Sequence, residues 1–311
     1  MDVKVFWNAI DWAEAVAALP ARGPLPSRVV LVPRERVAHV LRRELIRTGR
    51  GQVLAGTRFI TCPVAAVEVL RAGDVAFEPG EEALRAARLL ALFRAGLPLG
   101  HFPLELLRIK PGWDEAFGHT ISDLEGTGLR PEDLESPEGS ARMRDVATVW
   151  RALDDSAGRS WTTQRILLEA GATLEGRPYT WPFQGPVLGF AGGDVTGAEA
   201  RFLRAIPGLT LGLLAARPTR ERYLNGMEAL FGRAAGEALR SVQPTRASLT
   251  ERDLLASYLF EPPAVLADPA RPRSRGPDGT VDLEEHAGIE AEIEASADWV
   301  ARQVAEGVPL V

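Results

Sequence analysis

The sequence predicts an α/β protein whose parallel sheet is interrupted by a mostly helical segment. Short apolar, β-branched runs followed by amphipathic helices occupy the first 80 residues. Such runs are typical of strands buried on both faces of a parallel sheet. Residues 81–180 show helical periods and almost no strand pattern, and strand patterns return from residue 186 onward. Strand and helix therefore alternate on both sides of the helical segment, which is the α/β pattern.

The N-terminal part alternates strands and helices. The predicted elements are a strand at 3–7, a strand at 29–32, a helix at 36–47, a strand at 58–61 and a helix at 63–70. In the first of these helices Val37, Leu41 and Leu45 recur every four positions and form an apolar face. Gly49 is placed to end that helix.

The remaining elements follow the same reasoning. Helices are predicted at 82–93, 140–153, 162–170 and 289–304, and strands at 186–190, 209–214 and 281–286. Thr196 and Glu199 fit a capping box that begins another helix. Residues 261–280 are too rich in proline and polar residues for a packed element, which predicts a linker or mobile loop.

These elements predict two domains. Residues 1–80 and 181–311 form one discontinuous α/β domain, and residues 81–180 form a helical insertion. Residues 308–311 look like the approach to another strand, so we expect the chain to be a fragment of a longer protein.

Composition excludes several classes of function. No stretch of the 311 residues reaches the ~20 apolar residues needed to cross a bilayer, so we expect a cytoplasmic protein with no membrane partner. Cys62 is the only cysteine, and the four histidines have no metal-ligand spacing, so no metal or cofactor is expected. The net charge of -6 predicts that any contact with DNA comes from a local patch.

The most basic stretch lies between residues 34 and 50. It contains six arginines against Glu35 and Glu44, a local charge of +4. Arg34 and Arg36 are the best candidates for a contact with DNA phosphate, because ligands of parallel sheets gather at the carboxyl ends of the strands. Arg43 is a further candidate. The alternative is that these arginines are the solvated face of an amphipathic helix.

Thr61 ends a predicted strand and is the last nucleic-acid candidate. Its hydroxyl can bond a DNA phosphate, or it can cap the helix that follows. Four tryptophans in and beside the helical segment are better explained as core residues than as base-stacking platforms.

The order of these segments resembles the N-terminal helicase-like region of AddB-type subunits of bacterial helicase-nucleases, a family related to superfamily 1 helicases. Three collinear segments carry the resemblance: residues 29–36 with the strand ending in Thr61, residues 187–199, and residues 281–304. It implies a RecA-like fold, a partner helicase-nuclease subunit, and binding of DNA, either single-stranded or at a duplex end.

Departures from the family pattern indicate a degenerate ATP site. The first strand should lead into a glycine-rich phosphate loop with a lysine, but the loop residues here are Asn8, Ala9, Ile10 and Asp11. Leu188 stands where the family has the magnesium-binding aspartate. Asp194 lies near it, but an aspartate before a threonine cap is more often a turn residue.

We therefore expect no catalytic centre, because the family's nuclease motif would lie beyond Val311. The expected function is non-catalytic binding or guiding of DNA beside a partner motor in double-strand-break end processing. The parent protein would be an exonuclease subunit. A scaffold that docks a helicase without touching DNA is the alternative, and an unrelated NTPase with an unorthodox loop is a third.

Overall fold

The computed structural model describes residues 2–6, 9–20, 27–80, 82–135, 139–192, 194–215, 221–241, 254–255, 267, 286 and 288–306. The chain divides into two compact units, Met1–Gln243 and Pro244–Val311, and each is described by itself. The sequence placed residues 181–311 in a single domain with the sheet, whereas the structure separates the last of them as a second unit.

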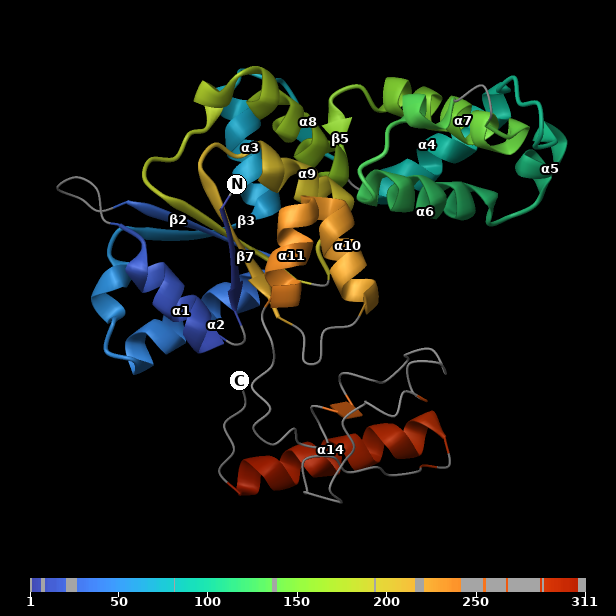
Figure 1. Ribbon diagram of the computed structural model, residues 1–311. Helices are drawn as coiled ribbons and strands as arrows, with labels where there is room; N and C mark the ends of the chain where they lie inside the picture. Colours follow the sequence, from blue (N-terminus) through green and yellow to red (C-terminus); the bar gives the residue numbers. More distant parts are fainter. Residues whose placement is uncertain are drawn as a thin grey trace. The chain divides into compact units, whose positions relative to one another are not determined.

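A parallel five-stranded sheet forms the centre of the first unit's described residues (Figure 1). Its strands are β1 (Asp2–Phe6), β2 (Arg28–Val32), β3 (Thr57–Thr61), β6 (Val187–Ala191) and β7 (Leu209–Leu214), in the spatial order β1-β7-β6-β2-β3. At the carboxyl edge Phe6 is paired with Leu214, and Val32 with Thr61. Every residue of β2 and β6 is buried, as expected for inner strands of a parallel sheet.

Helices cover both faces of this sheet, which confirms the predicted α/β class. On one face lie α1 (Ala9–Ala18) and α2 (Glu35–Arg47), followed by the 3₁₀ turn η1 (Gly51–Leu54). On the other lie α3 (Cys62–Ala72), α8 (Thr163–Gly176), α9 (Gly197–Ala205), α10 (Glu221–Phe231) and α11 (Arg233–Ser241).

The strand residues alternate between two cores. Val30 and Leu188 pack against α1 and α2, while their neighbours Val29 and Val187 pack toward α3, α8 and α9. This period of two is the geometry of a β-strand. Because both faces are covered by helices, these strands read as continuous apolar runs in the sequence.

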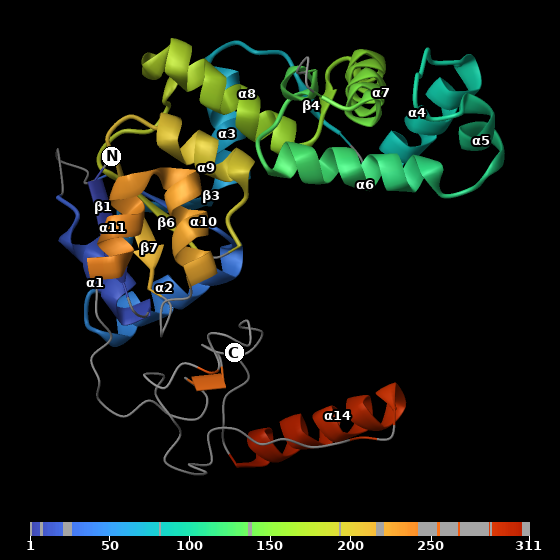
Figure 2. The ribbon, with the colours of Figure 1, turned by 45° about the vertical axis from the view of Figure 1, so that its right-hand side comes forward.

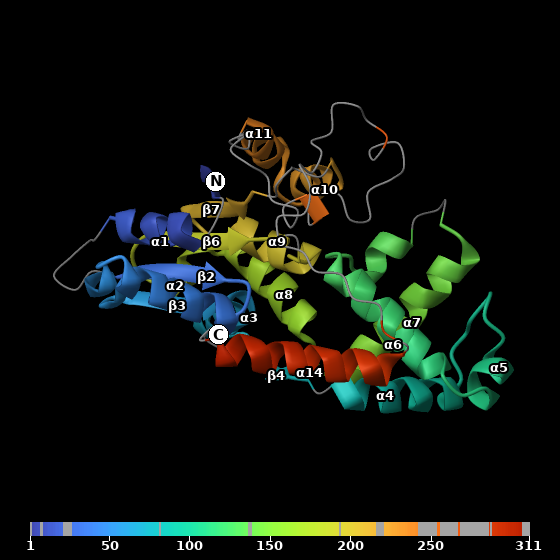
Figure 3. The same ribbon diagram turned by 90° about the horizontal axis from the view of Figure 1, so that it is seen from below.

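The helical segment has a core of its own. It comprises α4 (Glu82–Ala95), α5 (Leu104–Ile109), α6 (Trp113–Gly126), the 3₁₀ turn η2 (Pro131–Leu134) and α7 (Ala141–Ala157). Phe93, Phe117, Ile121 and Trp150 lie in this core, which is separate from both cores of the sheet. Figures 2 and 3 show these helices to one side of the sheet.

The chain enters and leaves this segment through a short parallel pair of strands, β4 (Glu78–Pro79) and β5 (Ser160–Trp161). The sequence assigned residues up to 180 to the helical segment. Helix α8 instead packs on α3 and α9, and its Leu167 and Leu174 belong to a sheet core. The 3₁₀ turn η3 (Pro178–Thr180) follows and lies against α8. The apolar face of α8 thus places it with the sheet.

The helical segment is fixed to the sheet by close contacts between α6 and α9. Arg201 of α9 donates to the carbonyl oxygen of Gly128 at 2.6 Å. A Cβ atom at Gly197 would collide with the backbone of Thr127, so glycine is required where the two helix ends meet. The predicted capping box at this helix start is confirmed, with Glu199 N 3.1 Å from Thr196 Oγ1 and Thr196 N 2.9 Å from Glu199 Oε2.

The prediction that the four tryptophans are core residues is confirmed for Trp150, whereas the other three are partly buried at the margin of a core. Trp150 is 2% exposed, and Trp113 packs against the same helical core. Trp161 and Trp181 pack against a core of the sheet.

In the second unit the predicted amphipathic helix is confirmed as α14 (Ile289–Ala305). The predicted linker at 261–280 and strand at 281–286 lie outside the described residues, apart from Ala267 and His286. Among the described helices, none has the length and apolar character required to cross a bilayer.

Asp145 of α7 fastens the loop between α4 and α5. Its carboxylate accepts hydrogen bonds from the backbone N–H groups of Gly100, His101 and Phe102 at 2.9, 2.7 and 2.9 Å. Burial raises the pKa of Asp145, but these three donors, together with the charge on His101, outweigh it and lower the pKa below its usual range.

Asp145→Asn is expected to lower the free energy of unfolding by about 1–3 kcal/mol at pH 7, because charged hydrogen bonds are replaced by neutral ones. A lowered pKa stabilises the fold above the unfolded-state pKa, and this contribution disappears as pH falls through the folded-state value. Urea unfolding at neutral and acidic pH should therefore show the gap between wild type and variant closing with acidification. A gap that stays constant or widens would contradict this role.

Candidate functional site

Aromatic side chains of β1, α1 and β6 pack together near the carboxyl end of β1. Helix α1 begins at Ala9, so Ile10 and Asp11 belong to its first turn, whereas Asn8 lies outside the described residues. The Trp12 ring stacks on Phe190 at a centroid distance of 4.0 Å and an interplanar angle of 13°. Phe6 meets the edge of the same Phe190 ring at 5.9 Å. All three aromatic side chains are at most 8% exposed, so they close the space between these strand ends and α1.

Leu188 lies inside the sheet. It is the second residue of β6, is 1% exposed and packs with the core under α1 and α2. The strand continues to Ala191, so Leu188 is not at the carboxyl edge. Asp194 follows the strand end, and its Oδ2 lies 3.2 Å from Nη2 of Arg34. The described residues contain no group of three or more His, Cys, Asp and Glu side chains that could hold a metal.

The structure brings three of the four predicted nucleic-acid residues to one edge of the sheet. Arg34 precedes α2, Arg36 lies in its first turn, and Thr61 ends β3 beside Val32. Thr61 occupies the N-cap position of α3, but its hydroxyl makes no capping hydrogen bond. Arg43 is two turns farther along α2, about 10 Å from Arg36 along the helix axis. It is therefore not part of this edge.

Ion pairs neutralise most of the basic stretch. Arg42 pairs with Glu35 at 3.3 Å and Arg47 with Glu44 at 2.7 Å, while Arg43 lies 4.0 Å from Glu44. Two further carboxylates come from other elements, because Arg50 pairs with Glu14 and Arg34 with Asp194. Within the described part of the chain, Arg36 alone of the six arginines has no ion-pair partner. The sequence count of +4 therefore overstates the charge of this surface.

A small apolar groove lies beside Arg36. It has a volume of about 250 Å³ and is lined by Ala9, Trp12, Arg36, Val37, Val40, Leu41 and Leu214. The groove joins the first turns of α1 and α2 to the end of β7. A free guanidinium thus stands next to an apolar surface at the carboxyl edge of the sheet.

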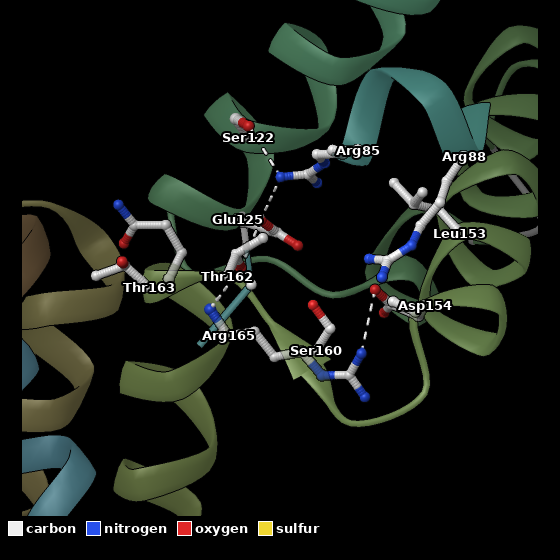
Figure 4. Close-up of a pocket in the computed structure, with 13 residues that line it drawn as sticks. Arg85, Arg88, Ser122, Glu125, Leu153, Asp154, Ser160, Thr162, Thr163 and Arg165 are labelled. Atoms are coloured by element: carbon white, nitrogen blue, oxygen red, sulfur yellow. Dashed lines mark hydrogen bonds and ion pairs between the residues drawn. The ribbon is translucent and has the colours of Figure 1, made fainter. Parts of the chain in front are cut away.

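A second cavity, of about 310 Å³, lies where the helical segment meets α8 (Figure 4). Arg85 of α4 donates to Ser122 Oγ at 3.0 Å and to Glu125 Oε2 at 3.2 Å. The hydroxyl of Thr162 also donates to Glu125, at 3.1 Å, and accepts from the backbone N–H of Arg165 as the cap of α8. This network ties α4, α6 and α8 together around the cavity.

Charges in this cavity are buried to an unusual degree. Arg85 is 8% exposed and Glu125 3%. Arg165 Nη1 lies 3.3 Å from Asp154 Oδ1. Burial raises the pKa of Asp154 to about 6, with the charge of Arg165 opposing the shift and that of Glu125 adding to it. Buried ionisable groups with displaced pKa values are typical of functional sites.

Sequence reasoning did not find this cavity. Arg85 and Glu125 are 40 residues apart, and each sits on an ordinary amphipathic helix. No local motif in the sequence indicates that these two residues meet.

Comparison with protein-family models and with curated proteins gave no match for this chain.

Proposed function

We propose that this chain is the non-catalytic, helicase-like part of an AddB-type subunit of a bacterial helicase-nuclease. In this proposal the sheet is a degenerate RecA-like domain that binds or guides DNA beside a partner's motor during processing of double-strand ends. The observation that carries it is the carboxyl edge of the sheet, where Arg34 and Arg36 follow the end of β2 and Thr61 ends the neighbouring strand β3.

The DNA-binding part of the proposal rests on Arg36 and its surroundings. An exposed guanidinium can contact backbone phosphate in a bidentate manner. Single-stranded DNA is commonly held by such cations together with apolar or aromatic surface for the bases. The groove beside Arg36 supplies apolar surface. The hydroxyl of Thr61, which makes no capping hydrogen bond, can donate a hydrogen bond to a phosphate. Both lie at the edge where parallel sheets bind their ligands.

The proposal assigns no ATP binding to this chain because of the residues that follow β1. A phosphate loop needs glycines that let backbone N–H groups approach the phosphates, and a lysine to meet their charge. Trp12 packs on Phe190 where α1 begins, and the described part of the turn offers neither residue type. In this proposal the nuclease centre belongs to the parent protein and lies outside the residues of this chain.

One observation favours the scaffold alternative. Five of the six arginines between residues 34 and 50 are engaged by carboxylates in the structure. A surface neutralised in this way, next to an apolar groove, also suits the docking of a partner protein. The two functions differ in whether the charge of this edge drives binding to DNA.

Arg34→Ala combined with Arg36→Ala is expected to weaken binding of single-stranded DNA and to reduce its salt dependence. Each phosphate contact contributes ~0.7 to the slope of log K against log salt for single strands. Loss of two contacts should lower the slope by about 1.4. Fluorescence anisotropy of a labelled oligonucleotide, titrated at several NaCl concentrations, measures both quantities.

The matched control is Arg42→Ala combined with Arg47→Ala, which removes the same charge from the same helix but away from the sheet edge. It should leave the slope nearly unchanged, because Arg42 and Arg47 lie about 9 Å or more beyond Arg36 along the axis of α2, away from the sheet edge. Equal slopes for wild type and the Arg34, Arg36 variant would reject the DNA contact and leave the scaffold function.

A further inference from the structure

The cavity between α4, α6, α7 and α8 has polar groups that nothing in the described part of the protein satisfies. Arg85 Nε and Gln164 Oε1 are buried and have no hydrogen-bond partner among the described residues. Buried polar groups in native proteins are nearly always hydrogen-bonded, so each exception requires an explanation. Both residues line the same 310 Å³ cavity. That volume lies at the lower end of the range for small-molecule sites, roughly 300–1,000 Å³.

The charge of the cavity favours an anion. Arg85 is balanced by Glu125, and Arg165 by Asp154. Arg88 also lines the cavity, one turn after Arg85 on α4, and has no ion-pair partner within the described part of the chain. Figure 4 shows its side chain extending from α4 on the side of Asp154. The cavity therefore holds one uncompensated positive charge.

The first turn of α8 adds donors to the same space. Thr162, Thr163, Gln164 and Arg165 all line the cavity, so the N-terminus of this 14-residue helix faces it. The first backbone N–H groups of a helix have no partner within the helix, and together with the helix dipole they bind phosphate. Ser160, just before the helix, contributes a hydroxyl group.

We propose that this cavity binds a small ligand through a phosphate group, held by Arg88 and the N-terminus of α8. Arg85, held by Ser122 and Glu125, and Gln164 in the first turn of α8 line the space that the ligand occupies. The phosphate belongs either to a free phosphate ester or to the end of a nucleic-acid strand. This site is separate from the sheet edge, so the inference does not rest on the proposed function.

Isothermal titration calorimetry of the whole chain tests the proposal with four probes. Inorganic phosphate and ribose 5-phosphate represent free phosphate. An oligonucleotide with a 5′-phosphate is compared with the same oligonucleotide ending in a 5′-hydroxyl. We expect at least one phosphate probe to bind. Selective binding of the 5′-phosphate strand identifies a strand end as the source, whereas binding of ribose 5-phosphate without that selectivity identifies a free ester.

Variants locate the binding. Arg88→Gln should weaken phosphate binding at least tenfold, and Gln164→Glu should do the same by placing a negative charge in the cavity. Arg94→Gln, which removes an exposed arginine from the last turn of α4, is the control and should bind like wild type. Absence of binding by every phosphate probe, or equal binding by wild type and both cavity variants in their folded state, would overturn the proposal.

Discussion

Glu125→Ala is expected to lower the free energy of unfolding by about 3–5 kcal/mol, because it leaves the guanidinium of Arg85 buried without its counter-charge. The two side chains are among the few charged groups buried in the described residues. The same substitution removes the acceptor for the Thr162 hydroxyl, which caps α8. Urea unfolding followed by far-UV circular dichroism measures the loss.

Two controls separate the burial of charge from the loss of a side chain. Arg85→Met combined with Glu125→Leu removes both charges and should be far less destabilising than Glu125→Ala, since replacing a buried pair by apolar residues is often neutral. Glu135→Ala breaks an exposed pair with Arg151, whose N–O distances are 2.7 and 2.8 Å, and should have a much smaller effect. Equal losses for the single and double cavity variants would contradict the explanation.

Trp12→Ala should lower the free energy of unfolding by roughly 3–5 kcal/mol, the usual cost of removing a large aromatic side chain from a core. Trp12 is 7% exposed and stacks on Phe190, so its removal opens a cavity between α1 and β6. Chemical denaturation of the variant measures the change. Trp12→Phe keeps a ring in the stack and should cost much less.

The same variants test whether the turn has lost its nucleotide chemistry. Opening the space should not create binding of Mg²⁺-ATP, because the described residues of the turn still lack a phosphate-binding glycine and a lysine. Titration of wild type and Trp12→Ala with a fluorescent ATP analogue and magnesium measures this. Magnesium-dependent binding by either protein would overturn the proposal of a degenerate ATP site.

The sequence predicted the sheet well because its signals are local. Runs such as Val29–Val32 are apolar at every position, and only strands covered on both faces need that pattern. The helix at α2 was predicted from the spacing of Val37, Leu41 and Leu45, the last two of which are fully buried. The boundary of the helical segment was placed too late, because the pattern of α8 shows that it is amphipathic but not which partner covers its apolar face.

The sequence predicted the net charge of the surface around residues 34–50 less well than it predicted the buried strands and helices. The charge counted between residues 34 and 50 included Glu35 and Glu44. It could not include Glu14 and Asp194, which belong to other parts of the chain and pair with Arg50 and Arg34 in the structure. Consequently the sequence could not single out Arg36 as the unpaired arginine of this stretch. The polar cavity escaped prediction for the same reason, since its residues come from four helices.

By itself, the sequence determined the α/β class, the five strands of the sheet, several of the helices, and the lack of phosphate-loop residues after the first strand; α1, α5, α6, α10 and α11 were found only in the structure. The tertiary structure alone decided that Trp12 stacks on Phe190 of β6, that Arg34, Arg36 and Thr61 share one edge, and that Arg85, Glu125, Asp154 and Arg165 surround one cavity. Secondary structure follows from periodicity within a few residues, whereas a site depends on contacts between side chains that are distant in the chain.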